Sequence, residues 1–129
     1  MPQTTPELTI LSAKAATGAG NNIDVEGFRM ATIIIASAGT ATLTVKLTGT
    51  TLETAPDFTA SRTVAVRYEY LAGTDVQSGS AVAGDTGIAF AGADDVRMLQ
   101  VDVRGLKWIT AVVTAYTAGN VSVFCKLYV

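Results

Sequence analysis

The chain has 129 residues, a formal net charge of −2 and a pI near 4.9, and it contains one cysteine and no histidine. This length suits one domain with its own core, and the scattered Lys and Arg residues argue against nucleic acid as a partner. Without histidine there is no Ser-His-Asp or Cys-His catalytic site, and one cysteine supports neither an internal disulfide nor a thiolate-rich zinc site.

The amino-terminal stretch carries no visible targeting signal. Residues 1–10 (MPQTTPELTI) lack the basic and apolar regions of a signal peptide. The longest apolar run, around residues 33–35, is far too short to span a bilayer. We therefore expect no membrane partner, and we interpret residues 1–7 as a flexible arm ahead of a single domain over residues 8–129.

Short alternating segments predict strands along the first half of this domain. The expected strands are 8–13, 23–25, 29–37 and 40–48. We join the last two in a hairpin at Ala38-Gly39. Residues 49–63 contain many threonines and predict a long connection.

The second half continues the same pattern. The expected strands are 64–71, 88–91, 99–104, 107–116 and 120–128. Residues 72–86 are rich in Gly, Ser, Ala and Asp and predict an exposed loop. Since no segment has a helical period, the sequence predicts an all-β fold: an antiparallel β-sandwich or jelly roll of about eight strands. Periodicity does not separate a jelly roll from an immunoglobulin-like sandwich.

One stretch of sequence occurs twice. Residues 38–47 (AGTATLTVKL) match residues 118–127 (AGNVSVFCKL), and upstream GFRMAT at 27–32 parallels GLKWIT at 105–110. We interpret each copy as a hairpin, made of a first strand, a Gly-centred turn and a return strand, in related positions of the two halves of a sandwich. Internal duplication and convergence of simple strand patterns both explain the likeness.

Alternation assigns faces to the two return strands, because side chains point to opposite sides in turn. The residues expected to point inward are Ala41, Leu43, Val45 and Leu47 in the first copy and Val121, Val123, Cys125, Leu127 and Val129 in the second. Cys125 is thus expected to be a buried small hydrophobe, not a nucleophile.

Aromatic side chains gather on the opposite face of the second copy. Phe124 and Tyr128 lie there, and the first strand of this copy adds Trp108 and Tyr116. Four aromatics are more than a face that meets only water requires. We predict that these four residues form an interface, with a covering loop or a second sheet as the alternative.

Carboxylates offer a remaining route to catalysis or metal binding. Asp85, Asp94 and Asp95 lie in GDTGIAFAGADDVR, with Glu69 and Asp75 upstream. Paired carboxylates can hydrolyse glycosides, and carboxylate oxygens can hold Ca²⁺. However, Asp in Gly-rich turns is favoured because it bonds its own backbone, and the segment matches no twelve-residue calcium loop. We predict no catalytic residue, cofactor or metal site, and leave calcium binding by the three aspartates open.

The composition and pattern of the sequence resemble those of small structural proteins of tailed bacteriophages. Its short Thr/Ala/Val segments, with GIAFAGADDVR at 87–97 and GLKWITAVVTAYTAGNVSV at 105–123, are most similar to jelly-roll decoration (cement) proteins of the capsid exterior. The resemblance implies a homo-oligomeric sandwich, dimer or trimer, that bridges neighbouring capsomers. It implies the major capsid protein as partner and the outer capsid surface as location, after synthesis in the cytoplasm of a bacterial host.

We therefore predict a non-enzymatic virion protein that decorates and stabilises a tailed-phage capsid. The alternative is a tail, baseplate or head-fibre component with a carbohydrate-binding role, in which Tyr68, Tyr70 or Trp108 provides a platform for a sugar.

Overall fold

The computed structural model describes residues 4–129, and all the regular elements in this range are β-strands, paired antiparallel. The strands are β1 (Leu8–Lys14), β2 (Gly18–Ala19), β3 (Ile23–Asp24), β4 (Met30–Thr50), β5 (Glu69–Tyr70), β6 (Gly73–Asp75), β7 (Ala81–Val82), β8 (Ile88–Ala91), β9 (Val96–Asp102) and β10 (Trp108–Tyr128). The predicted all-β class is confirmed, with ten strands in place of about eight. Residues 4–129 contain no helix long and apolar enough to cross a membrane.

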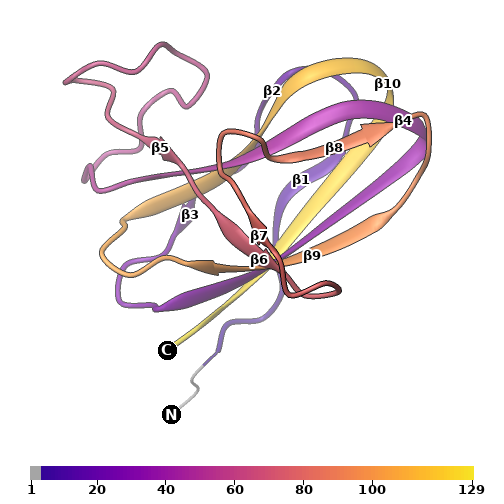
Figure 1. The fold of residues 1–129 in the computed structure, drawn as a ribbon. Helices are drawn as coiled ribbons and strands as arrows, with labels where there is room; N and C mark the ends of the chain where they lie inside the picture. The colour runs from indigo at the N-terminus through magenta and orange to yellow at the C-terminus, as the bar shows by residue number, and fades with distance from the viewer. Residues whose placement is uncertain (1–3) are drawn as a thin grey trace.

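Two long strands, β4 and β10, pair with each other along their whole length. The register runs from Met30 opposite Tyr128 at one end to Thr50 opposite Trp108 at the other. Both strands bend sharply midway, on the right-hand side of Figure 1. The predicted hairpins are therefore wrong: in each sequence repeat the first and return segments belong to one bent strand and pair with the other repeat.

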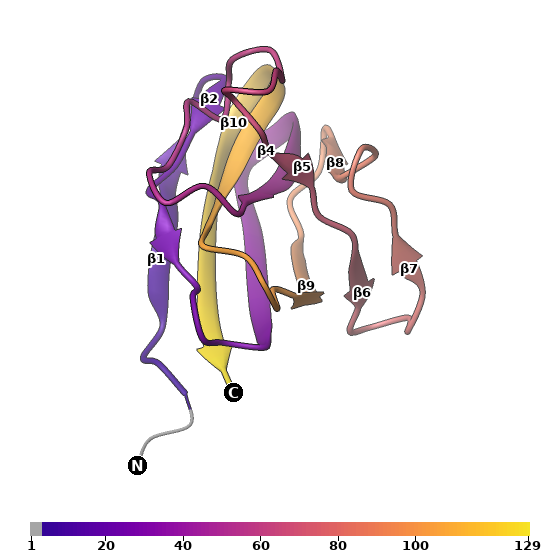
Figure 2. The same cartoon turned by 90° about the vertical axis from the view of Figure 1, so that its left-hand side faces the viewer.

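The bends fold the sheet into two layers. The first layer holds residues 30–37 of β4 and 120–128 of β10, extended by β1 on one side and by β9, β6 and β7 on the other. The second layer holds residues 41–50 and 108–118 of the same two strands, extended by β2, β3, β5 and β8. Figure 2 shows the strands of the first layer side by side, from β1 on the left to β7 on the right. Side chains of both layers meet in one buried core, as in a sandwich.

This pairing gives the sequence repeat a structural meaning. Residues 30–37 of the first copy pair with the return segment of the second, and residues 41–50 of the first pair with the beginning of the second. Reciprocal pairing of this kind is what an approximate twofold axis through the two bends produces. The second copy is longer before its bend, and β10 has register shifts there, between Val113 and Ala115 and between Tyr116 and Ala118.

The bends depend on glycine and on one aspartate. Gly39, Thr40 and Gly119 have φ values of 73°, 54° and 79°, in the left-handed region that favours glycine. Gly119 lies so close to β4 that a Cβ atom there would be 2.5 Å from the Cα of Ala41. The Asp94 carboxylate, between β8 and β9, accepts hydrogen bonds from the backbone N–H groups of Thr40 (3.1 Å) and Ala41 (2.9 Å) and so holds β4 in its bent course.

The inward-facing residues of the return segments are mostly as predicted. Ala41, Leu43, Val45 and Leu47 are buried, as are Val121, Val123, Cys125 and Leu127. The exception is Val129, which is 57% exposed because β10 ends one residue before it. Burial, and then the nearby charge of Glu7, raises the pKa of the Cys125 thiol to about 11, in keeping with a packed hydrophobe.

Three other segments differ from the prediction. Of the strand expected over 64–71, only β5 forms, and Val64 is 81% exposed. The loop expected over 72–86 contains the β6–β7 hairpin, which is anchored by buried Asp75 in an ion pair with Arg97. The pairing of the chain begins earlier than Leu8, because Thr5 exchanges hydrogen bonds with Leu127. Of the predicted flexible arm, residues 1–3 lie outside the described residues.

Candidate interaction surfaces

The outer surface of the first layer carries an apolar row that crosses three strands. Met98 of β9 lies opposite Ile34 of β4, which lies opposite Phe124 of β10. Directly opposed residues share one face of a sheet, so their side chains are neighbours. Each of these three side chains keeps contact with solvent, and Met98 is 37% exposed. Val96, two residues before Met98 on the same face of β9, is 60% exposed. We call this surface, with its adjoining residues Met30, Ala36 and Tyr128, the open face.

Polar groups of the open face are tied to each other. The Tyr128 hydroxyl donates a hydrogen bond to the Gln100 side-chain oxygen at 2.7 Å, and the Thr32 hydroxyl donates to the same atom at 3.3 Å. These bonds fix the Tyr128 ring beside the apolar row. Two of the four predicted interface residues, Phe124 and Tyr128, are thus brought together, along with apolar residues that the prediction did not include.

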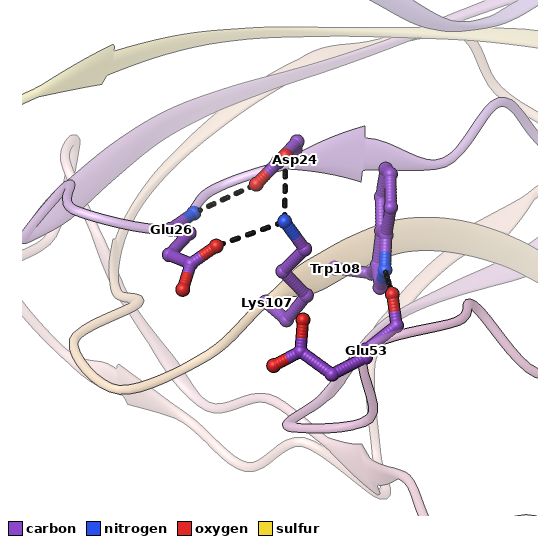
Figure 3. Close-up of polar contacts among 5 residues, drawn as sticks. All are labelled: Asp24, Glu26, Glu53, Lys107 and Trp108. Carbon is purple, nitrogen blue, oxygen red and sulfur yellow. Dashed lines mark hydrogen bonds and ion pairs between the residues drawn. The ribbon is translucent and has the colours of Figure 1, made fainter.

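Trp108 lies in the second layer, apart from this surface. Its indole N–H donates a hydrogen bond to the backbone carbonyl of Glu53 at 2.9 Å, as Figure 3 shows. Glu53 belongs to the long connection between β4 and β5, which passes over the outer side of this layer. Under this connection Thr48, Thr50 and Thr110 are buried, although alternation predicts that Thr48 points to solvent. Trp108 therefore lies against a covering loop, which was the alternative to an interface.

A charged cluster fixes the chain next to Trp108. The Lys107 amino group lies between the carboxylates of Asp24 (3.0 Å) and Glu26 (2.8 Å) in Figure 3, and 5.3 Å from the centre of the Trp108 ring. Hydrogen bonds to both carboxylates raise the pKa of Lys107 well above its usual range. The pKa of Asp24 is lowered by the backbone N–H of Glu26 and then by Lys107. Each charge has a partner, so this cluster is structural.

Tyr116 points to the core side of the sheet. It lies opposite buried Leu43, packs against the hydrophobic core, and donates a hydrogen bond from its hydroxyl to the carbonyl of Gly119 at 2.8 Å. The register shift between Val113 and Ala115 inserts one residue and so reverses the alternation on which its predicted face depended. The four predicted interface residues therefore do not share one surface.

A second surface surrounds three aromatic rings of the connection and β5. Phe58 and Tyr68 pack edge-to-face with ring centres 5.5 Å apart, and Tyr68 and Tyr70 do so at 6.0 Å. The Arg62 guanidinium lies 5.9 Å from the centre of Tyr68 and 5.2 Å from that of Tyr70, and the Lys46 amino group lies 4.9 Å from Tyr70. We call this group the tyrosine cluster.

Open grooves flank Tyr68 on both sides. One, of about 480 Å³, is lined by two arginines, a glutamate and several threonines: Gly49, Thr50, Thr51, Arg62, Thr63, Arg67, Tyr68, Glu69 and Leu106. The other, of about 460 Å³, has no charged residue in its lining: Thr17, Gly18, Phe58, Thr59, Tyr68, Tyr70, Val112, Val113 and Thr114. Tyr68 is held between them, since its hydroxyl donates to the carbonyl of Ala60 at 2.8 Å. Burial raises the pKa of this phenol.

The acidic residues considered for calcium or catalysis do not converge. Asp94 bonds the bend of β4, and Asp95 is linked to Ser37 through its backbone N–H and carbonyl. Asp85 lies exposed in the turn before β8. Within residues 4–129 there is no group of three or more His, Cys, Asp or Glu side chains that could hold a metal ion.

Comparison with known proteins identifies the fold. No protein-family model matches the chain, and no curated protein matches it. Among solved structures, the SPBc2 prophage-derived protein YomS superposes over 100% of this chain and 96% of its own, with a TM-score of 0.72 at 17% identity. The PBSX exported protein XepA superposes over 98% of this chain with a TM-score of 0.68 at 16% identity. The chain spans 39% of XepA.

These likenesses establish a shared fold. In YomS the shared fold accounts for 96% of the solved chain. In XepA it accounts for about two fifths of the chain. At 17% and 16% identity these likenesses show the fold alone, and the link to bacteriophages stays a prediction.

Proposed function

We propose that the chain is a non-enzymatic structural protein of a phage virion that decorates the capsid, with the open face as its contact surface. The observation that carries the proposal is the row formed by Met98, Ile34 and Phe124, which crosses three strands and remains in contact with solvent. An apolar surface of this kind on a soluble domain marks an interaction site. The fold shared with prophage-derived YomS supports a phage context.

The chemistry of the open face suits binding between proteins. Aromatic residues and methionine are enriched in protein interfaces, and Phe124, Tyr128 and Met98 are of these types. The hydrogen bond from Tyr128 to Gln100 orders its ring before binding, which reduces the entropy lost on contact. The expected partner is the major capsid protein, and symmetry would multiply a modest contact over many copies.

Copy number tests the location directly. Phage particles whose genome encodes this chain are purified, and the chain is quantified by mass spectrometry relative to the major capsid protein. A ratio near one, or a simple fraction of it, is expected for a decoration protein. A few copies per particle would place it in the tail or a fibre, and its absence from particles would refute the proposal.

Surface variants test the open face. We expect Met98→Glu combined with Phe124→Glu to weaken co-sedimentation with particles that lack the protein by at least about 10-fold, since both changes place charge in the apolar row. The control is Val64→Glu, which adds a charge at a residue that is 81% exposed in the irregular connection between β4 and β5. Equal binding by the double variant and the control would exclude the open face. Sedimentation velocity of the same proteins shows whether the face instead joins copies of this chain.

A further inference from the structure

The two grooves beside Tyr68 differ in a way that points to one kind of ligand. The neutral groove offers the threonine hydroxyls of Thr17, Thr59 and Thr114 next to aromatic rings. The hydroxyls of Thr17 and Thr114 can both donate and accept a hydrogen bond, as those of a sugar do, whereas the Thr59 hydroxyl donates to the Asp57 carboxylate and can accept from a ligand. A concave surface with aromatic walls and a few placed polar groups is typical of a small-molecule site.

The other groove supplies positive charge. Arg62 and Arg67 line it with a single acidic residue, Glu69, so the lining has one excess positive charge. Arg62 is held in place by its ion pair with Glu69 and by its position over the rings of Tyr68 and Tyr70. A guanidinium fixed in this way is suited to a carboxylate or phosphate, which it can bind through two parallel hydrogen bonds.

We propose that the two grooves form one site for an acidic oligosaccharide. Sugar rings lie in the neutral groove against Tyr68 and Tyr70, and a carboxylate or phosphate on a neighbouring unit reaches Arg62. Glu69 competes with the ligand for Arg62, because its carboxylate already occupies that guanidinium. A single-stranded nucleic acid fits less well, since the neutral groove presents no cation to a phosphate backbone.

The site is independent of the open face, so its failure would leave the proposed decoration role untouched. The tyrosine cluster belongs to the second layer and its covering connection, whereas the open face belongs to the first layer. A decoration protein with such a site would bring the particle to acidic glycans of a cell surface.

Affinity electrophoresis of the purified 129-residue chain tests the proposal. Native gels contain polygalacturonate, hyaluronate or phosphomannan, which distinguish carboxylate from phosphate. Dextran provides neutral sugar without charge, and polyglutamate provides charge without sugar. We expect retardation by at least one acidic polysaccharide and little by either control polymer. No retardation in any of the three gels, or equal retardation by dextran or polyglutamate, would overturn the proposal.

Variants assign the roles. Arg62→Gln and Tyr68→Leu should each weaken binding by about 10-fold, and Glu69→Gln should strengthen it about 2–5-fold because Arg62 is released. Thr114→Val, an exposed change in the neutral groove, serves as a second test if Tyr68→Leu unfolds. The matched controls Arg104→Gln and Glu53→Gln change charge by the same amount outside the grooves and should leave retardation unchanged. Equal effects of Arg62→Gln and Arg104→Gln would refute the assignment.

Discussion

A single methyl group at the bend of β10 should strongly destabilise this fold. In Gly119→Ala the new Cβ would lie 2.5 Å from the Cα of Ala41 and 2.7 Å from the carbonyl oxygen of Ala38. Non-bonded carbon atoms normally stay about 3.5–4.0 Å apart. Both neighbours belong to the β4 backbone, so the two strands must separate at the point where they cross between layers.

The expected loss has two parts. The φ of 79° at Gly119 is left-handed, which costs a residue with a side chain about 1–2 kcal/mol. Forcing a methyl group into a packed site costs about 1–3 kcal/mol more. The sum is about 2–5 kcal/mol, a large fraction of the roughly 5–15 kcal/mol that stabilises a typical domain. Gly105→Ala isolates the first part, because Gly105 has a similar φ of 82° but open space around the Cβ position.

Thermal unfolding followed by circular dichroism separates the two contributions. At about 4 °C per kcal/mol for a chain of this size, Gly119→Ala should lower the Tm by about 8–20 °C and Gly105→Ala by about 4–8 °C. Urea unfolding at 25 °C gives the same ranking as a free-energy difference. Equal destabilisation of the two variants would refute the close approach of the strands at the bend.

Three further predictions concern single side chains. Asp94→Ala should destabilise the protein by about 1–2 kcal/mol in urea unfolding, because two backbone N–H groups of β4 lose their acceptor, whereas Asp85→Ala, in an exposed turn, should have almost no effect. The Cys125 thiol should react with a thiol reagent only in denaturant, since it is fully buried and its pKa is raised; rapid labelling of the native protein would contradict its place in the core. The pKa of Asp102 is lowered to about 2, mainly by Arg104, and that of Asp75 is lowered mainly by Arg97. Carboxylates with lowered pKa values stabilise the fold above about pH 4 and lose this contribution as the pH falls toward 2. The midpoint of urea unfolding should therefore be constant from pH 7 to 5 and decline below pH 4. A midpoint that rises on acidification would show that these ion pairs do not form.

The sequence allowed the inner and outer faces to be predicted wherever a strand runs without interruption. Residues 41–47 and 121–127 alternate as expected, because a half-buried strand imposes a period of two on its side chains. β8, at residues 88–91, also has its predicted limits. The same rule failed at Tyr116, since a bulge shifts the period by one residue, and its only sign in the sequence is the greater length of the second copy before its bend.

Pairing could not be read from the local pattern. Gly39 allows a left-handed backbone, and both a hairpin turn and a bend within one strand need such a residue. The choice between them depends on the partner of each segment, which lies in the other copy of the repeat. The burial of Thr48 and Asp75 was not predicted, for a related reason. Thr48 is covered by the connection between β4 and β5, and Asp75 is paired with Arg97, and neither partner is local in the sequence.

The candidate surfaces were predictable in part. Phe124 and Tyr128 follow from alternation along one strand, whereas Met98 and Ile34 join them only through the register of neighbouring strands. Tyr68 and Tyr70 were predicted as a platform for a sugar, and the structure adds the charged neighbour, Arg62, from the irregular connection. Irregular segments carry no period, so their side chains could not be placed from sequence.

The pairing of β4 with β10 also determines when the protein can fold. Met30 pairs with Tyr128 near the other end of this domain, so the central pair of strands cannot form completely until residue 128 has been synthesised. Contacts between residues so distant in sequence also slow folding, because a long loop must close before they form. Until then, the apolar residues of β4 lack their partners in β10, and a chain that stops before residue 120 should aggregate, whatever the stability of the finished protein.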